Sequence, residues 1–247
     1  MMTMVDHLIE LRKRVLISVI AFMICVGISY PFSQTIFDFL LRPLAQVWQA
    51  GEPHRLIYTH LAEAFLVYLK VSLFMGFFIS FPIIAAQIWI FIAPGLYKHE
   101  KRSLLPFFIA APILFVIGAI FVYFLVIPNA WTFFVGFESV GSLTGIPIQL
   151  EAKIKDYLSL TMQLIIAFGL CFQLPIALLV LAKGGLVSSK TLRTKRKYSF
   201  VGILIVSAFL TPPDVLSMIA LATPMYGLYE LSILLVKLTE RKKEQTS

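Results

Sequence analysis

Six long apolar stretches constrain this chain more than any other feature of its sequence. Hydrophobic residues make up 59% of the 247 residues and charged residues only 14%, which is far from the balance of a soluble domain. A helix needs about 20 apolar residues to cross about 30 Å of hydrocarbon. We therefore predict an all-α integral membrane protein that forms one polytopic domain. The six predicted transmembrane helices cover residues 15–32, 64–94, 104–127, 158–182, 198–210 and 215–236.

The fifth and sixth spans are expected to be short helices. Residues 198–210 supply only about 20 Å of helix at 1.5 Å per residue, so the bilayer must thin there or polar ends must tuck inward. The connection "TPPD" (211–214) forces a tight helical hairpin. Prolines within or beside the spans predict kinks and a concave bundle. They are Pro82, Pro112, Pro175 and Pro224.

The cations alternate along the chain in a way that predicts its orientation. Of the 21 Lys and Arg residues, 16 lie in four segments: 1–14, 95–105, 183–198 and 237–247. The two predicted outer loops, 33–63 and 128–157, hold two each. This positive-inside pattern places both termini, including a tail at 237–247, in the cytoplasm. It also disfavours nucleic acid as a partner, because a nucleic-acid site would gather its cations on one surface.

Residues 4–15 predict a short amphipathic helix at the membrane surface, ahead of the first span. Their apolar side chains recur at helical spacing on one face, and the charged side chains lie on another. Ionisable or amide side chains at membrane depth are the other selective feature, because they are costly to strand in hydrocarbon. Those residues are Lys70, Gln163, Gln173 and Glu230.

The sequence contains no pattern typical of catalysis or of a cofactor site. The four histidines lack metal-ligand spacing, and there is no nucleotide loop or nucleophile elbow. Cys25 and Cys171 each lie inside a span and are expected to act as small hydrophobic residues. We therefore expect no catalytic residue, no metal and no cofactor.

Three motifs resemble TatC, the large membrane subunit of the twin-arginine (Sec-independent) protein translocase. They are "HLIELRKR" (7–14), "FIAPGLYKHEKR" (91–102) and "LTPPDVLSMIALATPMYGLYE" (210–230). The resemblance covers nearly the whole chain and implies a multi-pass protein of the bacterial cytoplasmic (inner) membrane. That family binds twin-arginine signal peptides of folded precursor proteins on its cytoplasmic face. It works in a multimeric complex in membrane lipid, and recruits TatA- and TatB-type single-span proteins for export driven by the proton-motive force.

The resemblance implies that Glu10 and Glu100 are the carboxylates that receive the signal peptide. Each guanidinium of a twin-arginine ligand can form a bidentate pair with a carboxylate, and Lys98, Arg102 and Arg14 would hold the two acids oriented in the empty site. The residues alone also allow a plain surface pair of Glu10 with Arg14, and a Glu100 that neutralises a crowded loop. The remaining residues of the implied signal-peptide site are Arg12, Phe91, Leu96 and Tyr97.

Other positions match the family at sites of partner docking or of structural importance. They are Pro43 in the first outer loop, Thr211 and Asp214 in the hairpin, and Glu230 at the end of the third motif. Gln173 departs from the pattern, because the family commonly has a glutamate there. An amide keeps hydrogen bonding but cannot titrate.

Two other classes of function compete with a translocase receptor. A proton-coupled small-molecule secondary transporter would need an ionisable residue at the midplane and usually a pair of related repeats. The mid-span polar group here is Gln173, and no convincing repeat is present. An intramembrane enzyme would need a nucleophile–base or metal pattern that the sequence lacks.

Overall fold

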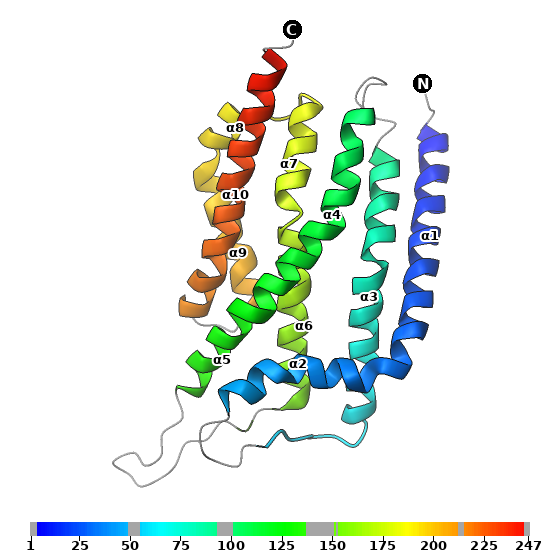
Figure 1. Cartoon of the computed structure of the whole chain (residues 1–247), viewed down its shortest axis with the longest axis vertical. Helices are drawn as coiled ribbons and strands as arrows, with labels where there is room; N and C mark the ends of the chain where they lie inside the picture. The colour runs from blue at the N-terminus through cyan, green and yellow to red at the C-terminus, as the bar shows by residue number, and fades with distance from the viewer. Residues whose placement is uncertain are drawn as a thin grey trace. The chain divides into compact units, whose positions relative to one another are not determined.

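The structure, a computed structural model, describes residues 4–48, 55–92, 101–136, 151, 153–211 and 215–244 (Figure 1). These residues are helical apart from short connections, and they contain no strand beyond an isolated bridge between Ile57 and Lys153. The predicted all-α class is confirmed. The helices are α1 (Met4–Ser29), α2 (Ser33–Val47), α3 (Glu63–Ile92), α4 (Lys101–Phe121), α5 (Ile127–Val135), α6 (Ile154–Cys171), α7 (Leu174–Lys183), α8 (Ser189–Thr194), α9 (Arg196–Leu210) and α10 (Val215–Glu244).

Five helical stretches of the described chain are long and apolar enough to cross a membrane. They carry the first four predicted spans and the last one. The predicted fifth span falls on α9, whose 15 residues are fewer than a regular crossing needs. The stretches are Val5–Val47, Glu63–Phe91, Ile109–Val135, Ile154–Lys183 and Leu221–Arg241.

Two predictions about helix ends are wrong. The segment 4–15 was expected to be a separate amphipathic helix with a turn before the first span. Instead it continues without a turn into the first span, because α1 is one unbroken helix of 26 residues. Its first 23 residues contain neither Gly nor Pro, so nothing interrupts the backbone ladder. The sixth helix is not short, since α10 has 30 residues and continues through most of the predicted tail. The tail consists mostly of helix-forming residues.

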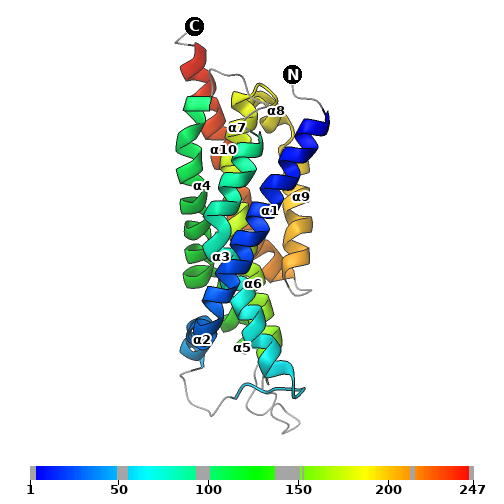
Figure 2. The same cartoon turned by 90° about the vertical axis from the view of Figure 1, so that its right-hand side faces the viewer.

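The described helices pack into two compact units. Unit 1 comprises Met1–Ser18, Pro82–Ala119 and Ile166–Ser247, and unit 2 comprises Val19–Phe81 and Ile120–Ile165. In unit 1, α10 packs on α7 and α9. The first turns of α1 and the last turns of α10 lie at the same end of this unit (Figures 1 and 2).

In unit 2, α2 runs crosswise to α3 and packs against α5 (Figure 1). Pro43 lies inside α2 and lacks the N–H that would bond to the carbonyl of Phe39. The Tyr123 hydroxyl donates to that carbonyl at 2.7 Å, and its ring stacks on Phe39 with centroids 4.5 Å apart. At the next residue, the Tyr157 hydroxyl donates to the carbonyl of Leu40 at 2.8 Å. Two tyrosines thus satisfy backbone acceptors at the proline.

Tyr123 reaches α2 from a distorted turn. Residues Val122–Val126 form a π-helix between α4 and α5, and a proline, Pro128, lies two residues after its end. The ring of Pro128 would clash with the carbonyl of Phe124, one turn earlier, and proline has no N–H to donate to that carbonyl. These two effects account for the wider turn. The positions of Pro43 and Pro128 in the sequence do not predict that Tyr123, in the turn before Pro128, donates to the carbonyl that Pro43 leaves free.

In unit 1, α4 and α6 approach closely at two glycines. A Cβ on Gly118 would lie 2.9 Å from the carbonyl oxygen of Phe168, and a Cβ on Gly169 would lie 2.5 Å from the ring of Phe115. Any larger residue would force these helices apart, as is common where small residues let membrane helices meet.

This close approach lets Gln173 bond across the two helices. The helix breaks between α6 and α7, where the Gln173 N–H bonds to Leu170 at 2.9 Å and leaves the carbonyl of Gly169 without its usual partner. The side-chain amide nitrogen donates to that carbonyl at 3.4 Å and to the carbonyl of Ala111 on α4 at 3.0 Å. Gln173 therefore acts as a hydrogen-bond donor to two backbone acceptors.

We expect Tyr123→Phe to lower the free energy of unfolding by about 1–3 kcal/mol, because the Phe39 carbonyl that Pro43 leaves free loses its donor. Thermal unfolding of the detergent-solubilised chain measures the change. Tyr58→Phe, at an exposed tyrosine of the same unit, is the matched control and should have little effect. Pro43→Ala restores the N–H, so Tyr123→Phe should cost less in that background. An equal cost with and without Pro43 would refute the role assigned to the hydroxyl.

Replacing Gln173 should separate its role as a donor from its size. Gln173→Leu leaves the carbonyl of Gly169 without its side-chain donor and removes the bond to Ala111, and we expect a loss of about 1–3 kcal/mol, whereas Gln34→Leu at an exposed position serves as control. In Gln173→Glu the carboxyl can donate only while protonated. Its stability relative to the parent chain should therefore fall as the pH rises, measured as the unfolding midpoint at pH 6 and pH 9. A midpoint difference that does not change with pH would contradict the donor role.

Candidate functional site

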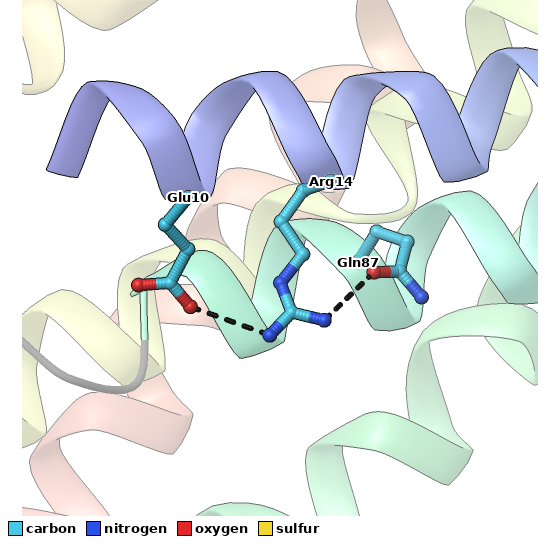
Figure 3. Close-up of polar contacts among 3 residues, drawn as sticks. All are labelled: Glu10, Arg14 and Gln87. Carbon is cyan, nitrogen blue, oxygen red and sulfur yellow. Dashed lines mark hydrogen bonds and ion pairs between the residues drawn. The ribbon is translucent and has the colours of Figure 1, made fainter. Parts of the chain in front are cut away.

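The first turns of α1 carry a carboxylate and a guanidinium that face α3. Figure 3 shows the Arg14 side chain between Glu10, one turn earlier on α1, and Gln87 on α3. Arg14 Nη2 lies 3.3 Å from Glu10 Oε1, and Arg14 Nη1 donates to Gln87 Oε1 at 3.2 Å. All three residues belong to unit 1. The four-residue spacing, with the acid first, is the favourable order for an ion pair on a helix.

This cluster is largely shielded from solvent and incompletely satisfied. The side chains of Arg14 and Glu10 are 23% and 18% exposed. Glu10 Oε2 and Arg14 Nε are buried and have no hydrogen-bond partner in the part of the chain that the structure describes. A charge-assisted N–H···O bond is usually 2.7–2.9 Å long, so the Glu10–Arg14 pair is a long one. The carboxylate can therefore accept a stronger donor.

A ring contact holds the start of α1 against α3. His7 stacks on Phe91 with ring centroids 4.4 Å apart. Phe91 and Gln87 are one turn apart on α3, and His7 and Arg14 are two turns apart on α1, so Glu10 lies between the two contacts along α1. The rings and the Arg14–Gln87 bond together fix the carboxylate in place.

The structure brings only part of the predicted signal-peptide site together. Phe91 lies near Glu10, because it stacks on His7 of the same helix as Glu10, and because Gln87, one turn before Phe91, bonds to Arg14. Arg12 is exposed and lies on another face of α1, because residues two apart on a helix do not face each other. Four predicted site residues lie outside the described residues, in the segment 93–100 that connects α3 to α4. They are Leu96, Tyr97, Lys98 and Glu100.

The residues predicted for partner docking or structure lie at separate places. Pro43 is buried in α2 of unit 2. Thr211 ends α9, and its hydroxyl donates to the carbonyl of Ser207 at 2.8 Å. Glu230 on α10 pairs with Arg196 at 2.5 Å, which gives it a local partner at the start of α9. Asp214 lies outside the described residues.

Sequence reasoning missed Gln87 and His7. Gln87 is an amide within the second apolar run, so its polarity at membrane depth was the available signal. Its spacing of one turn from Phe91 could also have placed it beside the second motif. His7 has no metal-ligand spacing, and the described residues contain no group of His, Cys, Asp or Glu that could hold a metal ion.

The chain matches one protein family over most of its length. The sequence profile described as Sec-independent protein translocase protein (TatC) matches residues 6–224. A protein of that description from Rickettsia prowazekii is 46% identical over 236 residues, which cover 95% of this chain and 92% of the relative. The Escherichia coli K12 protein is 38% identical over 230 residues, covering 93% of this chain and 86% of the relative.

A solved structure agrees with these relatives. A crystal structure described as the twin-arginine translocase receptor TatC superposes with a TM-score of 0.82 at 38% identity, and the match covers 94% of this chain and 98% of that one. Sequence and structure therefore agree over almost the entire polypeptide. The chain belongs to the TatC family of Sec-independent protein translocase proteins.

Proposed function

We propose that this chain is the receptor subunit of a twin-arginine protein translocase, and that Glu10 accepts an arginine of the signal peptide. The observation that carries the proposal is the Glu10 carboxylate, which is held by Arg14 on one oxygen and lacks a described partner on the other. Family membership supplies the class of cargo, which is a protein crossing a membrane.

A guanidinium fits this carboxylate better than other donors do. It is planar and always charged, and can bond both carboxylate oxygens at once. The Glu10 carboxylate is only 18% exposed, so the pair would be weakly screened by water and salt. The internal Glu10–Arg14 contact is long at 3.3 Å and engages one oxygen. A ligand arginine can therefore bond to Glu10 Oε2 while Arg14 keeps its bond to Gln87.

The second arginine of the ligand requires a second acceptor, and we assign it to Glu100. Residues 93–100 connect Ile92 of α3 to Lys101 of α4, and α3 carries both Gln87 and Phe91. Lys98 and Arg102 would orient the Glu100 carboxylate in the empty site, as Arg14 does for Glu10. Phe91, Leu96 and Tyr97 would provide apolar contacts to the peptide.

The orientation and the partners follow from the same proposal. The cation-rich segments would face the cytoplasm of a bacterium, with six crossings and both termini inside, and α9 would be a short fifth crossing.

The Thr211–Asp214 turn and the adjacent α9 and α10 would receive TatA- and TatB-type single-span proteins, because a short helix leaves a local mismatch with the bilayer. Export of folded proteins would be driven by the proton-motive force, in a multimeric complex.

A small-molecule secondary transporter is not favoured. Such a protein needs an ionisable group near the midplane, whereas Gln173 is an amide that donates to two backbone carbonyls. It serves the packing of α4 against α6 and cannot carry a proton. The relatives are described as protein translocase proteins.

The proposal is tested by the affinity of the purified chain for a twin-arginine peptide. Glu10→Gln and Glu100→Gln keep nearly the same shape but lose the charge-assisted bonds, which are worth about 1.5–3 kcal/mol. Each variant should bind the peptide about tenfold to a hundredfold more weakly. Glu100→Asp should be intermediate, because it keeps the charge but shortens the reach.

Glu151→Gln is the control, since it removes one carboxylate from an exposed ion pair with Arg55 in unit 2. It should leave peptide affinity unchanged. The preference for the twin-arginine peptide over its twin-lysine version should shrink in both site variants. If that preference survives in full, neither carboxylate is the acceptor.

A further inference from the structure

The connection between α8 and α9 carries a cluster of cations that the proposed receptor site does not use. Six of the 21 Lys and Arg residues lie in 183–198, and no Asp or Glu occurs between Asp156 and Asp214. Four of these cations are exposed within eight residues. We name them the junction cations: Lys190, Arg193, Lys195 and Lys197.

Contacts from α10 hold the backbone of this junction in place. The Tyr229 hydroxyl donates to the carbonyl of the buried Leu192 at 2.7 Å. The Glu240 carboxylate accepts from the Ser189 N–H at 2.9 Å and from its hydroxyl. Because α8 is fixed at both of these points, the junction cations project from a defined platform.

The two carboxylates of α10 near the junction already have other partners. Glu240 bonds to Ser189, and Glu230 pairs with Arg196 at 2.5 Å. The described residues provide no ion pair for the four junction cations; Lys197 contacts the ring of Tyr198 at 5.2 Å, which is a cation–π contact. Four cations within eight residues of the sequence, without an ion pair among the described residues, repel one another, so an external anion would relieve the repulsion.

Apolar side chains continue directly from these cations along α9. Val201, Ile205 and Phe209 follow Lys197 at four-residue intervals, so they form one stripe, and they are 54%, 53% and 81% exposed. The stripe from Lys197 to Phe209 is about 18 Å long at 1.5 Å per residue, close to the thickness of one hydrocarbon leaflet. Tyr198 is 67% exposed beside the cations, where aromatic side chains mark the membrane–water interface.

We propose that the junction cations bind the phosphate of an anionic phospholipid whose acyl chain lies along the exposed stripe of α9. A phosphodiester headgroup with no cation of its own, such as phosphatidylglycerol, complements the cluster. Phosphatidylcholine carries a compensating charge and fits less well. Each cation near the surface contributes about 1 kcal/mol to such an interaction, or about fivefold in affinity.

Native mass spectrometry of the purified full chain, with an equal mixture of phosphatidylglycerol and phosphatidylcholine, tests this site. The parent chain should retain phosphatidylglycerol preferentially. Replacing three junction cations together (Arg193→Gln, Lys195→Gln, Lys197→Gln) should reduce its retention at least tenfold and leave phosphatidylcholine unchanged. Lys197→Gln alone alters one exposed side chain and should cost about fivefold, so the site stays testable if the triple variant is unstable.

The matched control removes the same charge from unit 2, through Arg42→Gln, Lys153→Gln and Lys155→Gln, and should retain phosphatidylglycerol. Equal loss in the control would show diffuse attraction to net charge and overturn the site. Full retention of phosphatidylglycerol in both Lys197→Gln and the triple variant would also overturn the site. Displacement of the lipid by glycerophosphate, which has no acyl chain, would show a site for soluble anions. Displacement by an acidic peptide would instead show a protein-docking surface.

Discussion

Every backbone carbonyl that a proline or a helix break releases must find a donor, because an apolar surrounding offers no water to replace it. In unit 2, Pro43 releases the carbonyl of Phe39, and the Tyr123 hydroxyl donates to it. In unit 1, the break before Pro175 releases the carbonyl of Gly169, and the Gln173 amide donates to it. These polar side chains fix helices that apolar packing alone would leave free to slide.

The proposed receptor site also contains a buried acceptor, but this acceptor has no donor among the described residues. Arg14 satisfies one oxygen of Glu10 and the amide oxygen of Gln87, yet Glu10 Oε2 is buried without a partner in the described part of the chain. An unpartnered buried carboxylate oxygen is costly, and a strong donor that reaches it relieves that cost. On this account the affinity for arginine comes from a carboxylate held rigid and incompletely satisfied before the ligand arrives.

Apolar runs predicted much of this fold, because membrane crossing depends on length and hydrophobicity. The bounds of α3, Glu63–Ile92, agree closely with the predicted 64–94. The unbroken α1 and the full length of α10 were missed, since a change from apolar to polar composition need not end a helix. The contacts of Gln87 and Tyr123 could not be predicted, because their partners are 73 and 84 residues away. The role proposed for Glu10 was predicted only through the resemblance of its motif.

Direct bonding between Glu10 and a signal-peptide guanidinium underlies the proposed recognition of arginine. A double-mutant cycle tests it most directly, by combining Glu10→Gln with a peptide in which one arginine at a time is replaced by citrulline, its neutral isostere. We expect one arginine position to show a coupling free energy of about 1.5 kcal/mol or more, since the two changes remove the same bond. Additive effects at both positions would contradict direct contact.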